Sequence, residues 1–120
     1  MENRPKTIFC DIDGTLIEHT GNISMQLDLE FKDLLFGTIE KLKEWDRKGY
    51  NIILTTGRKE SMRKKTIEQL EKMGIFYDQL IMGIGGGCRV LINDLKEGSN
   101  QPTAIAFNPE RNKGIKDINI

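Results

Sequence analysis

Short, continuously apolar runs alternate with helix-like segments in this chain, and this alternation limits its fold more than any other feature. Between the runs, residues 38–48 and 62–73 carry apolar side chains at helical spacing, and Gly49 and Gly74 end these segments. Unbroken apolar runs are typical of parallel strands that are covered on both faces. We therefore predict an α/β fold, a Rossmann-like three-layer α/β/α sandwich with a parallel central sheet. The predicted strands are residues 7–10, 51–54, 79–82, 90–92 and 103–107.

Polar side chains follow several of these predicted strands directly. They are Asp11 and Asp13 after the first strand, Thr56 after the second and Asp94 after the fourth. In parallel sheets, ligands bind beyond the carboxyl ends of the strands. The pattern therefore predicts that these four side chains meet at one edge of the sheet.

The pair Asp11 and Asp13 is the strongest candidate for chemistry. Two carboxylates this close raise each other's pKa unless a cation neutralises them. A site made of a few carboxylates and water suits Mg²⁺, and the carboxylate that remains could attack phosphorus or move a proton. On spacing alone, a simple turn with aspartates at capping positions is also consistent with the pattern.

The string at residues 9–16, Phe-Cys-Asp-Ile-Asp-Gly-Thr-Leu, resembles the first motif of the haloacid dehalogenase-like hydrolase superfamily. The resemblance implies that Asp11 forms an aspartyl-phosphate and that Asp13 protonates the leaving group and then activates water. Gly14 and Thr15 would lie beside the bound phosphate. The implied activity is that of a magnesium-dependent phosphatase.

The second motif of that superfamily is similar to residues 52–58, Ile-Ile-Leu-Thr-Thr-Gly-Arg. The resemblance implies that Thr56 binds the phosphate, with Thr55 as the competing choice, while Gly57 and Arg58 contact substrate. Arg58 could instead be a solvated residue at the start of a helix.

The fourth motif is similar to residues 90–94, Val-Leu-Ile-Asn-Asp. It implies that Asp94 completes the metal ligands together with Asp11 and Asp13. The third motif should supply a basic residue that offsets the charge of the phosphate, but Gly83 is followed by Ile84 and not by Lys. We favour Arg89 for this role, and the alternatives are Lys96 and residues 63–65.

The chain of 120 residues fits one domain at 1–120, with a core at about 6–107. The tail at 108–120 stays unassigned, as a loose tail or a short terminal element. The gaps between the motifs are too short for the separate cap domain of many superfamily members. The chain therefore looks like a capless phosphatase. A small phosphorylated substrate, such as a sugar phosphate, is the predicted partner.

Composition narrows the remaining choices. Eighteen basic and eighteen acidic side chains cancel, which argues against nucleic acid as a partner. No apolar run reaches the length of a membrane span, and Cys10 and Cys88 are interpreted as buried free thiols of a cytoplasmic protein. Three alternatives remain open: a phosphate-accepting receiver domain, a non-catalytic binding protein and a nucleic-acid end phosphatase.

Residues 17–36 form a flap after the first motif. From Ile23 to Phe31, apolar side chains alternate with polar ones, as in a half-buried strand or hairpin arm. An apolar face on such an arm usually marks an interface. We therefore predict a homo-oligomer, a dimer or a tetramer.

Overall fold

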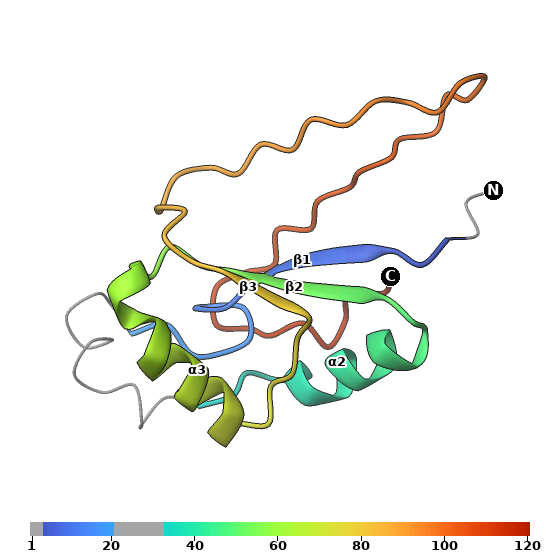
Figure 1. Cartoon of the computed structure of the whole chain (residues 1–120). Coiled ribbons are helices and arrows are strands. Elements are labelled where there is room, and N and C mark those ends of the chain that lie inside the picture. Colours follow the sequence, from blue (N-terminus) through green and yellow to red (C-terminus); the bar gives the residue numbers. More distant parts are fainter. Residues whose placement is uncertain (1–3, 21–32) are drawn as a thin grey trace.

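A parallel sheet forms the centre of the molecule. The computed structural model describes residues 4–20 and 33–120. Within them, β1 (Thr7–Asp11), β2 (Asn51–Thr55) and β3 (Gln79–Ile81) form a sheet of order β1-β2-β3 (Figure 1). Both strand pairs are parallel, and the register aligns the last residue of β1, Asp11, with Thr55. The predicted parallel α/β fold is confirmed, and so are its first three strands.

Two helices connect these strands. They are α2 (Thr38–Arg47) and α3 (Arg63–Lys72), and the 3₁₀ turn η2 (Glu60–Met62) precedes α3. Apolar residues at helical spacing, such as Leu42 and Trp45 of α2, are buried. In Figure 1 both helices lie below the sheet, as expected for consecutive right-handed crossovers in one direction.

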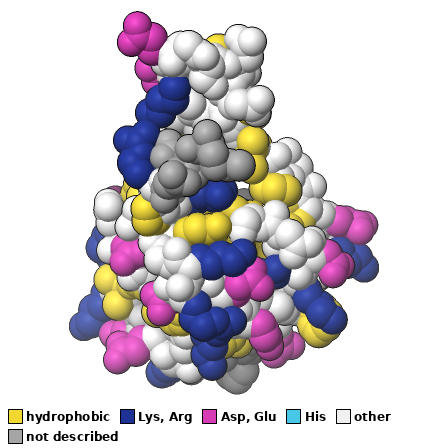
Figure 2. Space-filling view, turned by 90° about the vertical axis from the view of Figure 1, so that its right-hand side faces the viewer, with side chains coloured by type: hydrophobic (Ala, Val, Ile, Leu, Met, Phe, Trp, Pro, Cys, Tyr) yellow, Lys and Arg dark blue, Asp and Glu magenta, His cyan; other side chains and the backbone are white. Residues whose placement is uncertain are grey.

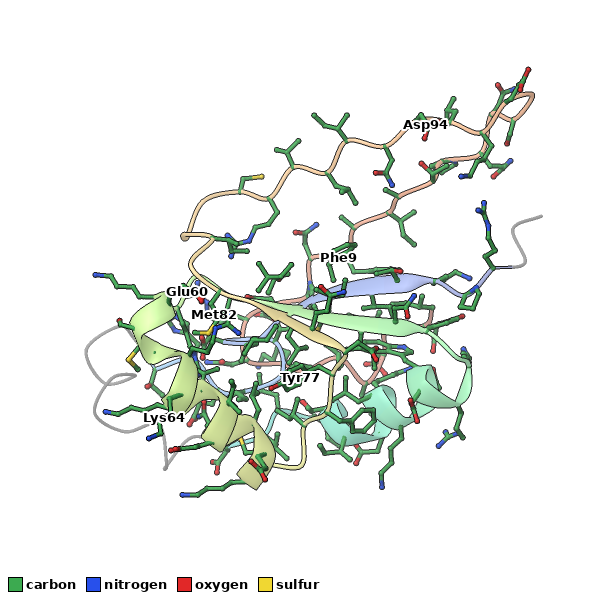
Figure 3. All side chains as sticks on the ribbon, in the orientation of Figure 1. Phe9, Glu60, Lys64, Tyr77, Met82 and Asp94 are labelled. Atoms are coloured by element: carbon green, nitrogen blue, oxygen red, sulfur yellow. The ribbon has the colours of Figure 1, made fainter. Side chains whose placement is uncertain are left out.

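The core lies between the sheet and these helices. Its fully buried side chains include Leu16 from the loop after β1, Leu54 from β2 and Leu70 from α3. Side chains of β1 alternate, so that Ile8 and Cys10 are buried whereas Phe9 is 53% exposed. Figure 3 shows Phe9 on the side of the sheet opposite to the helices. One face of the sheet is therefore well packed, and the other is only partly covered.

Residues 88–107, which we call the arm, correct two of the strand predictions. The runs at residues 90–92 and 103–107 form no strand, and the arm rises from the body as an outgoing and a returning segment (Figure 1). An apolar run becomes a strand only when its backbone groups find a partner. In the described parts of the chain, β1 pairs with β2 alone, so these runs are not added to the sheet.

The C-terminal tail, which the sequence leaves open as a loose tail or a short terminal element, packs on the core. Ile115 is buried, and its backbone N–H donates to the carbonyl of Phe36 over 3.0 Å. At the chain end, the carbonyl oxygen of Ile120 accepts hydrogen bonds from Lys48 and Tyr50. The tail therefore holds the start and the end of α2.

Three further expectations concern the cysteines, the flap segment and membrane spans. Cys10 is buried as predicted, but Cys88 is exposed at the start of the arm. Most of the alternating flap segment, residues 21–32, lies outside the described residues. No helix among the described residues is long and apolar enough to span a membrane.

Candidate active site

The candidate site lies where β1 and β2 end side by side. Asp11 is the last residue of β1, and its carboxylate accepts a hydrogen bond of 3.4 Å from the Thr15 hydroxyl. The register places Thr55 beside Asp11, so that Thr56 follows at the same edge. The structure therefore brings the first two motifs together, as predicted from parallel strands that end in polar residues.

The electrostatic environment of Asp11 suits a reactive carboxylate. Burial raises the pKa of Asp11 above its ordinary value, although part of the side chain reaches solvent. A hydrogen bond from the Ile12 backbone lowers this pKa, the Asp13 carboxylate raises it, and the Arg89 guanidinium lowers it. A cation bound beside Asp11 would favour its charged form against the cost of burial.

Asp13 is held by the guanidinium of Arg58. Nε of Arg58 donates to Oδ2 of Asp13 over 2.9 Å, and Nη2 donates to Oδ1 over 2.7 Å. The Arg58 side chain is 1% exposed and the Asp13 side chain 12% exposed, so the pair is shielded from solvent. This two-point contact fixes the orientation of the Asp13 carboxylate.

Helix α3 supports this guanidinium from behind. Nη1 of Arg58 donates to the Thr66 hydroxyl over 3.0 Å and to the Gln69 side-chain oxygen over 2.7 Å. Both residues are buried on the face of α3 that looks toward the sheet. Arg58 is therefore neither a solvated residue nor a group free to contact substrate. This role of Arg58 could not be predicted from the sequence, because Thr66 and Gln69 resemble ordinary polar residues of a helix.

Thr56 and Gly57 form the turn that leads to Arg58. Thr56 is buried, and its hydroxyl accepts a hydrogen bond of 3.1 Å from the Arg58 backbone N–H. A Cβ on Gly57 would lie 2.7 Å from the carbonyl oxygen of Gly85, which is closer than side chains are found. Glycine is thus required where the segment after β3 crosses this turn.

The C-terminal tail closes the loop after β1. Gly14 has a φ of +86° and the Gly14 carbonyl accepts a hydrogen bond of 2.8 Å from the Asn112 backbone. Oδ1 of Asn112 also accepts a hydrogen bond of 2.8 Å from the His19 backbone N–H, and Nδ2 of Asn112 donates one of 3.0 Å to the His19 carbonyl. Asn112 itself has a φ of 64°. This contact was not predicted from the sequence, because residues 108–120 are unassigned there.

The predicted site residues of the arm separate into two groups. Arg89 begins the arm and lies close enough to influence Asp11, and it also donates a hydrogen bond to the Gly87 carbonyl. Asp94 and Lys96 are exposed further along the arm, and Figure 3 shows Asp94 far above the sheet. In this conformation the arm does not bring Asp94 to Asp11, which corrects the expected grouping of all four strand-end residues.

The fit of a divalent cation can be judged from the donors at this edge. The Asp11 carboxylate offers hard oxygen atoms of the kind that Mg²⁺ prefers, whereas both carboxylate oxygens of Asp13 are bound by Arg58, which leaves the Asp13 backbone carbonyl as a donor. A cation beside Asp11 would offset the burial of its charge. Within residues 4–20 and 33–120, no three acidic, histidine or cysteine side chains come together as metal ligands. The residues present therefore fit part of a magnesium site, and a further carboxylate is needed.

Fold and comparisons together place this chain in the haloacid dehalogenase-like superfamily. Residues 5–84, about two thirds of the chain, match the model of the family described as the polynucleotide kinase PNKP phosphatase domain. The chain belongs to this family. No curated protein gives a significant match.

Solved structures agree with this assignment. One is described as a Pnkp1/Rnl/Hen1 complex, and it matches 73% of this chain at 31% identity with a TM-score of 0.59. A second, described as the Pnkp1/Rnl/Hen1 RNA repair complex, matches 80% at 29% identity with a TM-score of 0.56. This chain spans only 31% and 28% of the lengths of those chains.

A structure from Vibrio cholerae shows the same fold at 23% identity, with a TM-score of 0.53, over 74% of this chain and 79% of that one.

The family and the two repair complexes also correct one expectation. The neutral net charge argued against nucleic acid as a partner, and that argument is wrong for a member of a polynucleotide phosphatase family. Net charge reports the sum of all side chains and not their position around one site.

Proposed function

We propose that this protein is a magnesium-dependent phosphatase that removes the terminal phosphate of a nucleic acid, through an aspartyl-phosphate on Asp11. The observation that carries the proposal is the match of residues 5–84 to a polynucleotide phosphatase family, a range that includes Asp11, Asp13 and Arg58. The comparisons favour this substrate over the sugar phosphate that was our first expectation.

The chemistry follows from the positions of two carboxylates. An oxygen of Asp11 attacks phosphorus, and the bond from phosphorus to the leaving oxygen breaks while Asp13 donates a proton to that oxygen. Water then attacks the phosphorus of the aspartyl-phosphate and gives a proton to Asp13, which frees the Asp11 carboxylate and returns Asp13 to the protonated form in which it began. Mg²⁺ would be held by the Asp11 carboxylate and the Asp13 backbone carbonyl together with a further carboxylate, for which Asp94 is our candidate, and it would offset negative charge on the phosphate.

Arg58 has a positioning role in this scheme. It binds both oxygens of Asp13 and is itself held by Thr66 and Gln69. Proton transfer is sensitive to small displacements, so a carboxylate fixed from behind is better oriented toward the leaving oxygen. Arg89, whose charge already acts on Asp11, is our candidate for the cation that faces the phosphate.

An open site agrees with a polymeric substrate. The part of the chain that the structure describes contains no cap domain between Arg58 and Asp94. Thr56 and the backbone around Gly57 remain our proposed phosphate ligands, with Gly14 and Thr15 beside them. The strand end of a nucleic acid can reach such a site without a lid having to open.

The test compares substrates directly. Oligonucleotides with a 3′- or a 5′-terminal phosphate, in RNA and in DNA, are incubated with the protein and Mg²⁺ beside a set of sugar phosphates. We expect a higher kcat/KM for at least one oligonucleotide than for every sugar phosphate. Asp11→Asn should be inactive on all substrates, and excess chelator should abolish activity. Faster hydrolysis of a sugar phosphate would refute the substrate class, and full activity in chelator would refute the metal.

A further inference from the structure

The arm carries apolar side chains that are exposed in the described part of the chain. Val90 is 79% exposed and Ile92 is 88% exposed on the outgoing segment, and Ile105 is 65% exposed on the returning one. Leu91, Leu95 and Phe107 are each about half exposed. The arm also lengthens the molecule, which measures 51 × 28 × 25 Å. Figure 2 shows the arm as a narrow projection with hydrophobic side chains at its base.

A matching surface exists on the body. Within the described residues, β1 pairs only with β2, so the other edge of β1 presents unpaired backbone groups. On the face away from the helices, Phe9 of β1 and Ile81 of β3 are 53% and 39% exposed. An open edge beside a partly apolar face is the surface to which further strands can be added.

The direction of the arm decides which copy can use this surface. β1 runs from right to left in Figure 1 and ends at the site, whereas the outgoing segment runs from left to right, away from the site. Asp94 thus lies far from the end of β1, the strand whose last residue is Asp11 of the same chain (Figures 1 and 3). If a twofold axis perpendicular to the arm relates two copies, the outgoing segment of the second copy runs in the opposite direction to that of the first. The outgoing segment of the second copy then runs parallel to β1 of the first copy and carries its Asp94 toward the site of the first copy.

We propose that two copies of this chain exchange their arms, each lying along the open β1 edge and exposed sheet face of the other, and that Asp94 of the second copy completes the carboxylate site at Asp11 and Asp13. The exchange rests on the exposed surfaces and on the direction of the arm. Only the role of Asp94 rests on the proposed function.

The size of the exposed surface agrees with a dimer. The six arm side chains named above are each about half exposed or more. Taking roughly 100 Å² for a large aliphatic side chain, they present about 400 Å² of apolar surface on each arm. Two arms and the two surfaces that they cover would then remove about 1,600 Å² from water, which is the usual size of a stable interface.

The first experiment measures mass and needs no activity. Light scattering of the wild-type protein at micromolar concentration should give about twice the chain mass of 13.7 kDa. Val90→Lys/Ile92→Lys should give the mass of one chain, with an unchanged far-UV circular dichroism spectrum. The control Ile67→Lys alters a partly exposed apolar side chain on α3 and should leave the dimer intact. A monomeric wild type, or a double variant that stays dimeric, would overturn the exchange.

The second experiment tests the shared site. Asp11→Asn and Asp94→Asn, each inactive alone, are unfolded, mixed in equal amounts and refolded. After random reassociation, half of the dimers contain one copy of each variant. If Asp94 acts in the other copy, one of the two sites in each mixed dimer has both Asp11 and Asp94. About a quarter of the wild-type activity should therefore return. No recovery from a mixture of dimers would overturn supply by the second copy.

A metal-binding measurement keeps this result separate from the proposed function. Mn²⁺, followed by electron paramagnetic resonance, should bind the wild-type dimer about tenfold or more tightly than the monomeric Val90→Lys/Ile92→Lys variant, because that variant loses a carboxylate ligand. Equal Mn²⁺ affinity of the two proteins would contradict the shared site. A dimer that binds Mn²⁺ yet hydrolyses no phosphate ester would leave the exchange standing and refute the phosphatase.

Discussion

Replacing Arg58 by glutamine should destabilise the protein strongly. The guanidinium makes four side-chain hydrogen bonds, two to Asp13 and one each to Thr66 and Gln69. Its loss leaves the Asp13 carboxylate, whose side chain is only 12% exposed, without a countercharge. Breaking a buried ion pair in this way costs about 3–5 kcal/mol. For a slope of about 1–3 kcal/mol per molar urea, the midpoint of unfolding should fall by about 2 M.

Urea unfolding at pH 7 measures this loss, and Arg63→Gln is the matched control. Arg63 also pairs with a carboxylate through two points, but this pair with Glu60 is exposed to solvent. The control should therefore lose much less stability, because exposed pairs are screened. Adding Asp13→Asn to Arg58→Gln should recover part of the loss, since no unpaired charge is then buried. The reasoning is refuted if Arg58→Gln loses no more stability than Arg63→Gln.

Three more variants test other parts of the site. Asp11→Asn should abolish phosphate release yet raise stability at pH 7. The pKa of Asp11 is raised in the folded protein, so its charged form costs stability at every pH above the unfolded pKa of about 3.9. The stability gained by Asp11→Asn, measured by urea unfolding, should therefore vanish as the pH is lowered below that value. A variant less stable than the wild type at pH 7 would contradict this direction of the pKa shift. Ile115→Ala should lower the free energy of unfolding in urea by about 2–5 kcal/mol, because Ile115 is only 1% exposed. The control Ile67→Ala should lower it less, because Ile67 is 38% exposed. Equal losses of stability would show that the tail is not part of the core. Gly57→Ala should lower kcat, because the added Cβ would lie 2.7 Å from a backbone carbonyl oxygen. The control Gly86→Ala should keep the wild-type kcat, because a Cβ there meets nothing within 4 Å. Equal kcat values for the two variants would disprove that the turn at Gly57 is crowded.

Local sequence determined most of the body of this protein. The bounds of β1, β2 and β3 agree with the predicted runs within one residue at each end, and both helices lie where apolar spacing and a following glycine predicted them. The meeting of Asp11 with the end of β2 was also predictable, because parallel strands that end in polar residues share one edge. These features depend on residues that are close in sequence or on the direction of strands.

The tertiary structure alone decided the partners of Arg58 and the place of the tail. Asp13 lies 45 positions before Arg58, and Asn112 bonds a residue 93 positions away. No local pattern encodes such contacts, because each depends on how separate elements pack. Net charge likewise gave no position for the groups around the site, so it misled us about nucleic acid.

The arm shows the same limit for strands. Residues 90–92 have the apolar composition of a strand, and yet their exposed side chains and unpaired backbone form none within the described chain. Sequence determined that this segment is able to pair, but only the tertiary arrangement decided whether a partner strand lies beside it. A helix satisfies its hydrogen bonds within one segment, whereas a strand needs a neighbour that the segment itself does not specify.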